Sequence, residues 1–247
     1  MSSGHPSRRT VLTMLGLTLL SVFSAFLLGG FRIVVPPKHT AWEAGEALTL
    51  PPPRLKGEVT VEEAIASRRS RRKYSGSPLE LWELGQLLWA AQGVTEPNLK
   101  FRAAPSAGAT YPLEVYVEAG SGGVKGLQAG VYHYKPENHS ISMVKPGDFH
   151  RELCSAALGQ EWVGRAAVNL VVCAVYERTA ERYGERGKTR YVHMEAGHAG
   201  ENVYLQAEAL GLATVAVGAF HDKQVSAVLS LPENHKPLYI YPVGRKP

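Results

Sequence analysis

The sequence predicts an α+β fold in which helices cover a β-sheet in three layers. Segments with the patterns of strands and helices interleave along the chain, but they do not follow the regular βαβ alternation of a doubly wound sheet. Residues 166–176 (AAVNLVVCAVY) are almost all apolar or β-branched, which is typical of a strand buried on both faces. The glycine fingerprint G-x-G-x-x-G is absent, so a Rossmann-type dinucleotide site is not expected.

Residues 1–31 form a predicted export signal or membrane anchor. No charged residue occurs from Val11 to Phe31, and a helix of this length could cross about 30 Å of hydrocarbon. The preceding Ser-Arg-Arg-Thr resembles a twin-arginine export signal with Arg8 and Arg9 as its pair, and an ordinary anchor that stays in place is the alternative. Either interpretation places the rest of the protein outside the cytoplasmic membrane of a prokaryote, in the periplasm or at the cell surface.

Residues 32–57 are expected to be a linker. They contain five prolines and no sustained hydrophobic period, which is typical of a semi-rigid spacer. The folded domain is therefore predicted to begin near Glu58 and to occupy residues 58–247 as a single unit.

Two capping boxes predict the first helices of this domain. A Thr-x-x-Glu box opens a short helix within residues 60–69. A Ser-Pro-x-Glu box, with proline at the first helical position, opens a longer helix over residues 78–92 that is expected to end at Gly93. Leucine and alanine residues three and four positions apart give the longer helix one apolar face.

The rest of the domain is predicted from the spacing of its apolar residues. Alternating or β-branched runs indicate strands, and apolar residues three and four positions apart indicate helices. The expected strands are 113–119, two arms of a hairpin within 130–144, 166–176, 213–218 and 237–244, and the expected helices are 148–159, 191–210 and 222–231. The first half of the helix at 191–210 is rich in alanine and glycine, so another part of the protein can approach its backbone closely.

The charge, cysteine and histidine content argues against several classes of site. The formal net charge of +5 is too small for the broad basic face of a nucleic-acid-binding protein. Cys154 and Cys173 lie in apolar runs and are expected to be buried thiols. His193 and His198 diverge by about 140° around a helix, so they are not expected to share a metal ion. No metal site is expected.

A cluster of five cationic side chains occupies the positions from Arg68 to Lys73 (RRSRRK). Nucleic acid, a membrane surface and the phosphate of a cofactor are three anions that it could hold, and a solvated basic loop is a further interpretation. Guanidinium groups bind phosphate oxygens in bidentate geometry, and two or three of them neutralise a dianion. A nucleic-acid patch is disfavoured because no aromatic stripe or second basic run accompanies the cluster.

Three motifs, in order along the chain, resemble the nitroreductase family of FMN enzymes. They are RRS-x-R at 68–72, PSAGATYP at 105–112 and EAGHAGENVYLQAEALGLATVAVG at 195–218. Within this family the sequence is most similar to the SagB-type dehydrogenases, which include the thiazole/oxazole-forming azoline oxidases, and the similarity covers residues 58–247. The resemblance implies a three-layer αβα sandwich with a mixed, mainly antiparallel sheet flanked by helices.

The same resemblance implies an FMN site. An N-terminal arm, formed by Arg68, Arg69, Ser70 and Arg72, would hold the phosphate and ribityl oxygens. A loop, formed by Pro105, Ser106, Ala107 and Gly108, would run beside the isoalloxazine ring, and the backbone of Val217, Gly218 and Ala219 would meet its N5 edge. Arg245, near the C-terminus, would be a second phosphate ligand. In this family FMN lies in the interface of an obligate homodimer, so each site would draw on both chains.

The activity implied is that of an FMN-dependent oxidoreductase. Bound FMN would exchange hydride or electrons with a small-molecule or peptide substrate, and a membrane component is a candidate electron donor. Tyr183 and Tyr111 are candidate catalytic groups on the substrate side. The azoline oxidases carry a Lys-Tyr pair where this sequence has Arg182-Tyr183, and arginine is too basic to release a proton readily.

Two other functions are compatible with the sequence. A conventional NAD(P)H-dependent nitro- or quinone reductase would use the same cofactor. A non-enzymatic, membrane-tethered binding protein would keep the fold without the cofactor, although the intact arginine cluster argues against it.

Overall fold

The computed structural model describes residues 45–247. The expected signal or anchor at residues 1–31 lies outside the described residues, and so does the first part of the expected linker. Within the described range, no helix combines the length and the apolar character that a bilayer span requires.

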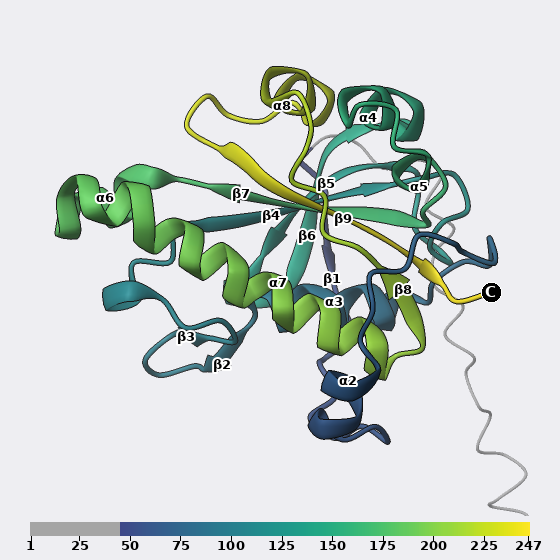
Figure 1. The fold of residues 1–247 in the computed structure, drawn as a ribbon, viewed down its shortest axis with the longest axis horizontal. Coiled ribbons are helices and arrows are strands. Elements are labelled where there is room, and N and C mark those ends of the chain that lie inside the picture. The colour runs from purple at the N-terminus through teal and green to yellow at the C-terminus, as the bar shows by residue number, and fades with distance from the viewer. Residues whose placement is uncertain (1–44) are drawn as a thin grey trace, which may run out of the picture. The chain divides into compact units, whose positions relative to one another are not determined.

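Seven strands form one sheet, and each described pair of neighbours in it is antiparallel (Figure 1). A separate two-stranded hairpin and two isolated bridges, one parallel between Leu79 and Val124 and one antiparallel between Val217 and Ile240, complete the described pairing. The expectation of a mainly antiparallel sheet is therefore confirmed. In spatial order the strands are β1 (Ala47–Thr49), β6 (Ser140–Pro146), β5 (Gly130–Lys135), β4 (Leu113–Ala119), β7 (Val168–Ala174), β9 (Lys236–Arg245) and β8 (Leu212–Thr214), and the hairpin is β2 (Val94–Glu96) with β3 (Phe101–Arg102).

Helices cover both faces of the sheet, which confirms the three-layer α+β fold. The described helices are α2 (Val61–Ser67), α3 (Leu81–Gln92), α4 (His150–Ala156), α5 (Glu161–Gly164), α6 (Tyr176–Arg186), α7 (Val192–Ala209) and α8 (Asp222–Leu229). Helices α3 and α7 lie on one face, and α4, α5 and α8 lie on the other (Figure 1). Each face therefore has its own hydrophobic core.

Strand β7 connects these two cores. Leu170 and Val172 point into the core beneath α3 and α7, whereas Val171 and Cys173 point into the core beneath α4 and α8. None of the four exposes any measurable surface, because successive side chains of a strand point to opposite faces. The predicted strand buried on both faces is confirmed. Cys173 is a free buried thiol, as expected, while Cys154 is free but only partly buried.

The folded domain begins earlier than the expected boundary at Glu58. Residues 47–49 pair with β6 at the edge of the sheet, and Leu50 enters the core with 3% of its surface exposed. The guanidinium of Arg54 lies 3.6 Å from the centre of the Trp82 ring. Pro51, Pro52 and Pro53, the prolines of the expected spacer that the structure describes, belong to an extended segment held against the sheet and α3, since proline favours extended backbone at sheet edges.

Helix α3 begins at Leu81 rather than at Pro78. Leu79 forms the isolated bridge to Val124, which keeps its backbone extended. Glu80 therefore becomes the N-cap, and its capping box involves the glutamate three positions later. The capping box of α2, the end of α3 at Gly93, the strand at 113–119 and the hairpin within 130–144 are confirmed.

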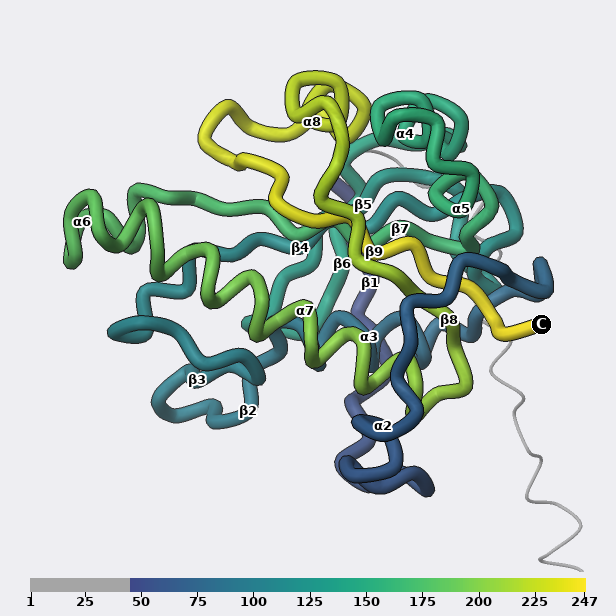
Figure 2. The backbone as a smooth tube through the Cα atoms, viewed as in Figure 1, coloured from purple at the N-terminus to yellow at the C-terminus, as the bar shows by residue number. Residues whose placement is uncertain are grey.

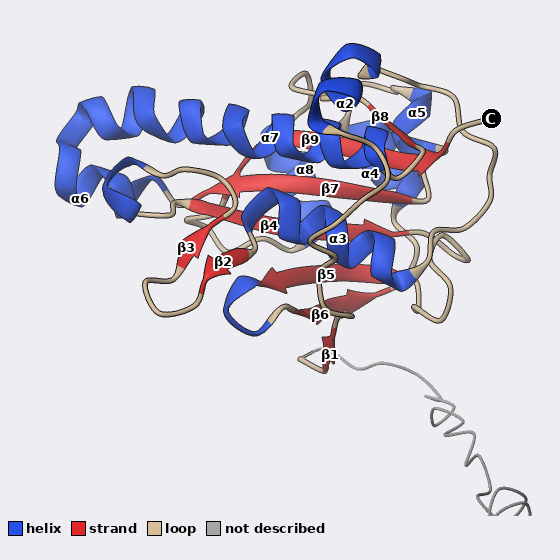
Figure 3. Cartoon of the chain, turned by 90° about the horizontal axis from the view of Figure 1, so that it is seen from below, coloured by secondary structure: helices blue, strands red, loops and turns tan. Residues whose placement is uncertain are grey.

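Helix α6 was not predicted from the sequence. Gly184, with φ 58° and ψ −148°, interrupts it, and a π-helical turn at Gly187–Tyr191 connects it to α7 (Figure 3). Tyr176, Ala180 and Tyr183 recur at helical spacing, but charged residues dominate the segment and the apolar stretch is short. π-Helical turns occur frequently at functional sites.

The alanine- and glycine-rich half of α7 packs on its own sheet. Ala196, Ala199 and Gly200 are buried, and a Cβ atom on Gly200 would lie 2.0 Å from the hydroxyl oxygen of Tyr241. Small residues therefore allow α7 to approach β9 closely, as the sequence suggested.

Candidate functional site

The arginine-rich arm, residues 68–72, lies along the end of the sheet. The backbone N–H of Arg71 donates to Thr214 O of β8 at 2.8 Å, and the N–H of Ser75 donates to Arg245 O of β9 at 3.0 Å. In Figure 2 this dark-blue segment runs from α2 past β8 towards the C-terminal end of the chain. Backbone hydrogen bonds, rather than the arginine side chains, therefore fix the position of the arm.

Tyr204 of α7 joins the arm to the segment that contains Val217, Gly218 and Ala219. Its hydroxyl lies 2.9 Å from Ser70 Oγ and accepts a 2.7 Å hydrogen bond from the backbone N–H of Ala216. The structure thus brings together two of the groups expected at the site. Tyr204 lies in the third motif, but no role was predicted for it from the sequence.

The same segment is held from the other side by the loop before α5. Gln160 Nε2 donates to the carbonyl oxygen of Ala219 at 2.8 Å. Val217 pairs with Ile240 in both directions, so its N–H is occupied. Within residues 45–247, the N–H groups of Gly218 and Ala219 have no protein acceptor, and they can serve a bound ligand.

Three guanidinium groups of the arm are only weakly engaged. Arg68 lies 3.9 Å from an exposed carboxylate oxygen of Glu201, a contact of little energetic value. Arg69 donates only to backbone carbonyl oxygens, and Arg72 lies 5.2 Å from the centre of the Trp162 ring. Among the described residues, no carboxylate lies within salt-bridge distance of Arg69 or Arg72. These groups are therefore available to bind an anion.

Arg245 does not lie free to act as the expected second phosphate ligand. Its Nε donates to Pro78 O at 3.0 Å, and its Nη2 donates to Glu83 Oε2 at 2.8 Å. The side chain of Glu83 is only 5% exposed, and a buried carboxylate requires a partner. Arg245 borders the arm through its backbone, but its side chain joins the end of β9 to the start of α3.

The loop from Pro105 to Gly108 forms a second group of the expected residues. Ser106 Oγ accepts a 2.9 Å hydrogen bond from the N–H of Tyr111. Gly108 has φ +60°, and a Cβ atom there would lie 2.6 Å from the hydroxyl oxygen of Tyr183. Arg182 Nη1 donates to the carbonyl oxygen of Gly108 at 3.1 Å. Both candidate tyrosines therefore adjoin this loop, and position 108 requires glycine.

A buried carboxylate lies behind this loop. Glu195 of α7 is 2% exposed, and its carboxylate lies next to the Ser106 side chain. Burial raises the pKa of Glu195 to about 7, while the neighbouring Ser106 hydroxyl and the charge of Arg102 oppose the increase. Glu195 is the first residue of the third motif, but the sequence did not indicate its burial.

The arm at residues 68–72 and the loop at residues 105–108 contact α7 at different positions along its length. The loop contacts α7 at Glu195 and the arm contacts it at Tyr204. These residues are nine positions apart, which corresponds to about 14 Å along the helix axis. One chain thus presents two partial sites, one rich in cations and one rich in tyrosine.

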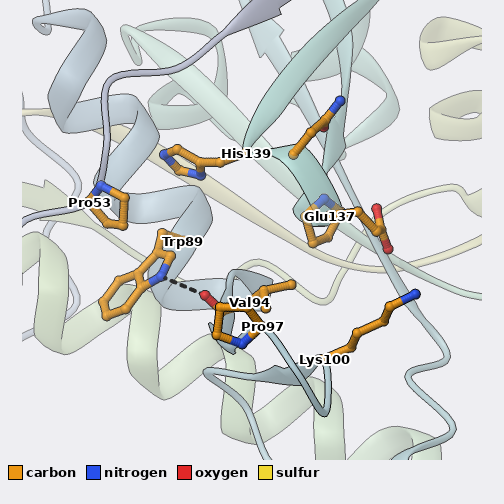
Figure 4. Close-up of a pocket in the computed structure, with 9 residues that line it drawn as sticks. Pro53, Trp89, Val94, Pro97, Lys100, Glu137 and His139 are labelled. Atoms are coloured by element: carbon orange, nitrogen blue, oxygen red, sulfur yellow. Dashed lines mark hydrogen bonds between the residues drawn. The ribbon is translucent and has the colours of Figure 1, made fainter.

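A separate pocket of about 400 Å³ lies between the segment at Pro53, α3 and the turn before β6 (Figure 4). Trp89 forms one wall and donates from Nε1 to Val94 O at 3.3 Å. His139 forms another, and burial lowers its pKa, which favours the neutral imidazole. The remaining lining residues are Pro97, Lys100, Pro136, Glu137 and Asn138. None of the expected site residues lines this pocket, so it is distinct from both partial sites.

The fold identifies the class of the protein. A crystal structure of a nitroreductase from Ralstonia eutropha has the same fold, with a TM-score of 0.70 and 30% sequence identity, over 81% of this chain and 90% of that one. The microcin synthetase McbBCD complex of Escherichia coli also shares the fold, with a TM-score of 0.63 and 24% identity over the full length of both chains. The protein is therefore a nitroreductase-like oxidoreductase.

The chain belongs to the Nitroreductase family, whose sequence model matches residues 65–245. It is 46% identical to a protein of Methanocaldococcus jannaschii named as a nitroreductase, over 202 residues that make up 82% of this chain and 98% of that protein. It is 30% identical to the microcin B17-processing protein McbC of Escherichia coli over 156 residues, which are 62% of this chain and 57% of that protein. The resemblance to the nitroreductase family is thereby confirmed.

Proposed function

We propose that this protein is an FMN-dependent oxidoreductase that acts as a homodimer outside the cytoplasmic membrane, exported or anchored by its N-terminal segment. It exchanges hydride or electrons between FMN and a small-molecule or peptide substrate, with a membrane component as the electron donor. The observation that carries the cofactor proposal is the arm of residues 68–72 bound through Tyr204 to the segment at 216–219. The charge-free run at 11–31 supports the location outside the cytoplasm.

The residues of the arm fit a flavin phosphate. In the part of the chain that the structure describes, Arg68, Arg69 and Arg72 are cations without a strong internal partner. Two or three guanidinium groups suffice to neutralise a dianion. Bound FMN would supply hydride and one-electron chemistry. The free N–H groups of Gly218 and Ala219 can donate to the polar edge of the ring. Arg245 contributes by holding the arm in place through β9.

The loop group supplies the substrate side. Tyr183 and Arg182 both contact Gly108 and lie next to the π-helical turn. Arg182 remains a cation at any physiological pH, so it orients an anionic or carbonyl-bearing substrate and does not act as a base. The Tyr183 hydroxyl, at the surface of the loop, can donate a hydrogen bond to the same substrate.

The cofactor is tested with the full-length protein purified in mild detergent. We expect the absorbance of oxidised flavin and release of FMN identified by mass. Replacing both Arg69 and Arg72 by alanine should weaken FMN binding by at least about 10- to 100-fold, because charge-assisted hydrogen bonds are lost. The matched control replaces two exposed arginines, Arg151 and Arg165, by alanine. This variant should bind FMN like the wild type. A colourless protein that takes up no FMN would refute the proposal and favour the non-enzymatic binding protein.

A second candidate is an NAD(P)H-dependent nitro- or quinone reductase. The relative from Methanocaldococcus jannaschii, 46% identical and named as a nitroreductase, favours it. Rapid mixing of the flavin-loaded protein with NADPH or with a quinol separates the two. Rapid bleaching by NADPH alone would establish the conventional reductase, whereas reduction by quinol alone supports the membrane donor.

A further inference from the structure

Glu195 combines burial with incomplete hydrogen bonding. It lies in the first turn of α7 with 2% of its surface exposed, and within the described residues its Oε1 atom has no partner. Its carboxylate also lies next to the Ser106 side chain, immediately before the turn that contains Gly108. An ionised carboxylate with an unpartnered oxygen is costly inside a protein, so this site favours the neutral acid.

The charged neighbours of Glu195 do not offset its burial. Arg102 of β3 is the cation that acts on it, but Arg102 donates to Gln92 of α3 at 3.1 Å and to Glu137 at 3.2 Å. Gln92 is itself neutral. On α7, His193 is exposed, and the centre of its ring lies 5.7 Å from the centre of the Tyr176 ring. The pKa of about 7 follows from this balance, since burial exceeds the opposing effects of Ser106 and Arg102.

We propose that Glu195 is a positioning residue that gains and loses a proton and thereby sets the direction of the Ser106 hydroxyl in the loop beside the flavin. This inference rests on the proposed function, because it gives the loop its role next to FMN. No covalent bond forms or breaks, and the proton is exchanged with water. The same residue would make the loop respond to pH near neutrality.

The two states follow from the hydrogen-bonding capacity of the hydroxyl. Ser106 Oγ already accepts from the N–H of Tyr111 at 2.9 Å, which leaves one donor proton and one lone pair. When Glu195 is ionised, Ser106 donates its proton to the carboxylate. When Glu195 is neutral, its O–H donates to the remaining lone pair, and the Ser106 proton turns to the open side of the loop. Pro105 and Gly108 are exposed there, so a ligand can accept that proton.

The titration is tested without the cofactor. In full-length protein labelled with ¹³C at the glutamate carboxyl, NMR should show one resonance that titrates near neutral pH and is absent in Glu195→Gln. The control Glu152→Gln, an exposed glutamate of α4, should retain it. Ser106→Ala removes a hydrogen bond to the ionised form and should raise the titration midpoint by about one pH unit. A Glu195 resonance that titrates in the ordinary acidic range, or one unaffected by Ser106→Ala, would overturn the inference.

A second measurement tests the link to the flavin. In the FMN-loaded protein, Glu195→Gln should change the pH dependence of the midpoint potential near neutrality while retaining FMN. Glu152→Gln should behave as the wild type. A pH dependence that is the same in Glu195→Gln as in the wild type would refute the coupling. If the wild type binds no FMN, the proposed function fails, and the NMR titration still decides whether Glu195 exchanges its proton through Ser106.

Discussion

At the residue scale, Arg245 shows how packing changes the role that a motif implies. Its guanidinium pairs with Glu83, whose side chain is 5% exposed, and also bonds Pro78 O. The carboxylate would otherwise be a buried charge with only the α3 capping interaction. Arg245 is one-third exposed, so the pair is partly screened but still structural.

Replacing Arg245 by methionine should therefore reduce the stability of the fold more than it reduces the affinity for FMN. We expect the free energy of unfolding in urea to fall by about 2 kcal/mol, because Glu83 loses its charged partner. FMN affinity should change little. Arg165→Met is the matched control: its pair with Glu161 is exposed on both sides and should be worth less than about 0.5 kcal/mol. Loss of FMN with unchanged stability would restore the phosphate-ligand role.

His150 forms a second buried ion pair, in the layer opposite α7. Its Nδ1 lies 2.8 Å from Glu118 Oε1 and its Nε2 lies 2.7 Å from Ala166 O. Burial lowers the pKa of His150, but the hydrogen bond and charge of the fully buried Glu118 outweigh burial and raise it overall. With Asp148, these residues are close enough to hold a metal ion, yet both ring nitrogens of His150 are already bonded within the protein.

The raised pKa of His150 predicts a pH dependence of stability. The folded state binds this proton more tightly than the unfolded chain, so its stabilising effect is complete below about pH 6.5 and is lost as pH rises through the folded value. His150→Gln should remove this alkaline decline and cost about 2 kcal/mol in acid. Urea unfolding at several pH values is the measurement. His193→Gln, at an exposed histidine, should leave the decline unchanged, and an unaltered decline in His150→Gln would contradict the assignment.

At the element scale, α7 contains two glycines in different environments. Gly200 is buried, and a Cβ there would lie 2.0 Å from the Tyr241 hydroxyl oxygen. Tyr241 is only 2% exposed and cannot move aside freely. Gly197 is exposed, and a Cβ there would meet no atom within 4 Å. The pattern of small residues is the same at both sites, but the packing differs.

Alanine at these two positions should have opposite effects on stability. Gly200→Ala should reduce the free energy of unfolding by about 1–3 kcal/mol, because the core is overpacked at Tyr241. Gly197→Ala should increase it by about 0.5–1 kcal/mol, since alanine is the better helix former. Chemical denaturation measures both. Equal effects of the two substitutions would mean that α7 does not approach β9 as described.

The elements that the sequence predicted and those that it did not differ in their physical origin. The strand at 113–119 and the end of α3 at Gly93 were predicted because local pattern determines them. The predicted start of α3 was wrong because Leu79 forms an isolated bridge with Val124, a residue far along the chain. Helix α6 was not predicted because its apolar side chains are few and Gly184 interrupts it.

At the scale of the whole molecule, the arm and the loop lie about 14 Å apart along α7 in one chain. A two-fold axis that pairs two copies of α7 in antiparallel orientation would place the loop of one chain near the arm of the other. Met194, on the solvent side of α7, is 52% exposed and is available for such a contact. This arrangement is the one that the proposed homodimer predicts.

Mixed dimers test whether each site uses both chains. One subunit carries Arg69→Ala and Arg72→Ala, the other carries Gly108→Val, and the heterodimer is isolated through two different tags. A shared site predicts one intact and one doubly altered site, and therefore about half of the wild-type FMN content. Each altered homodimer should hold little FMN. A heterodimer without FMN would place each site within a single chain, and a monomer in analytical ultracentrifugation would exclude the dimer.

The sequence by itself determined the family, the three-layer fold and the arginine arm, because these depend on local pattern and on motifs that occur in a fixed order. It also supplied the expected leader, which lies outside the described residues. Only the tertiary structure decided which charges remain free. Within residues 45–247, Arg69 and Arg72 keep their guanidinium groups without a carboxylate partner, whereas Arg245 is bound to Glu83. The reason is physical: the energy of a charge depends on its burial and on neighbours that come from distant parts of the chain.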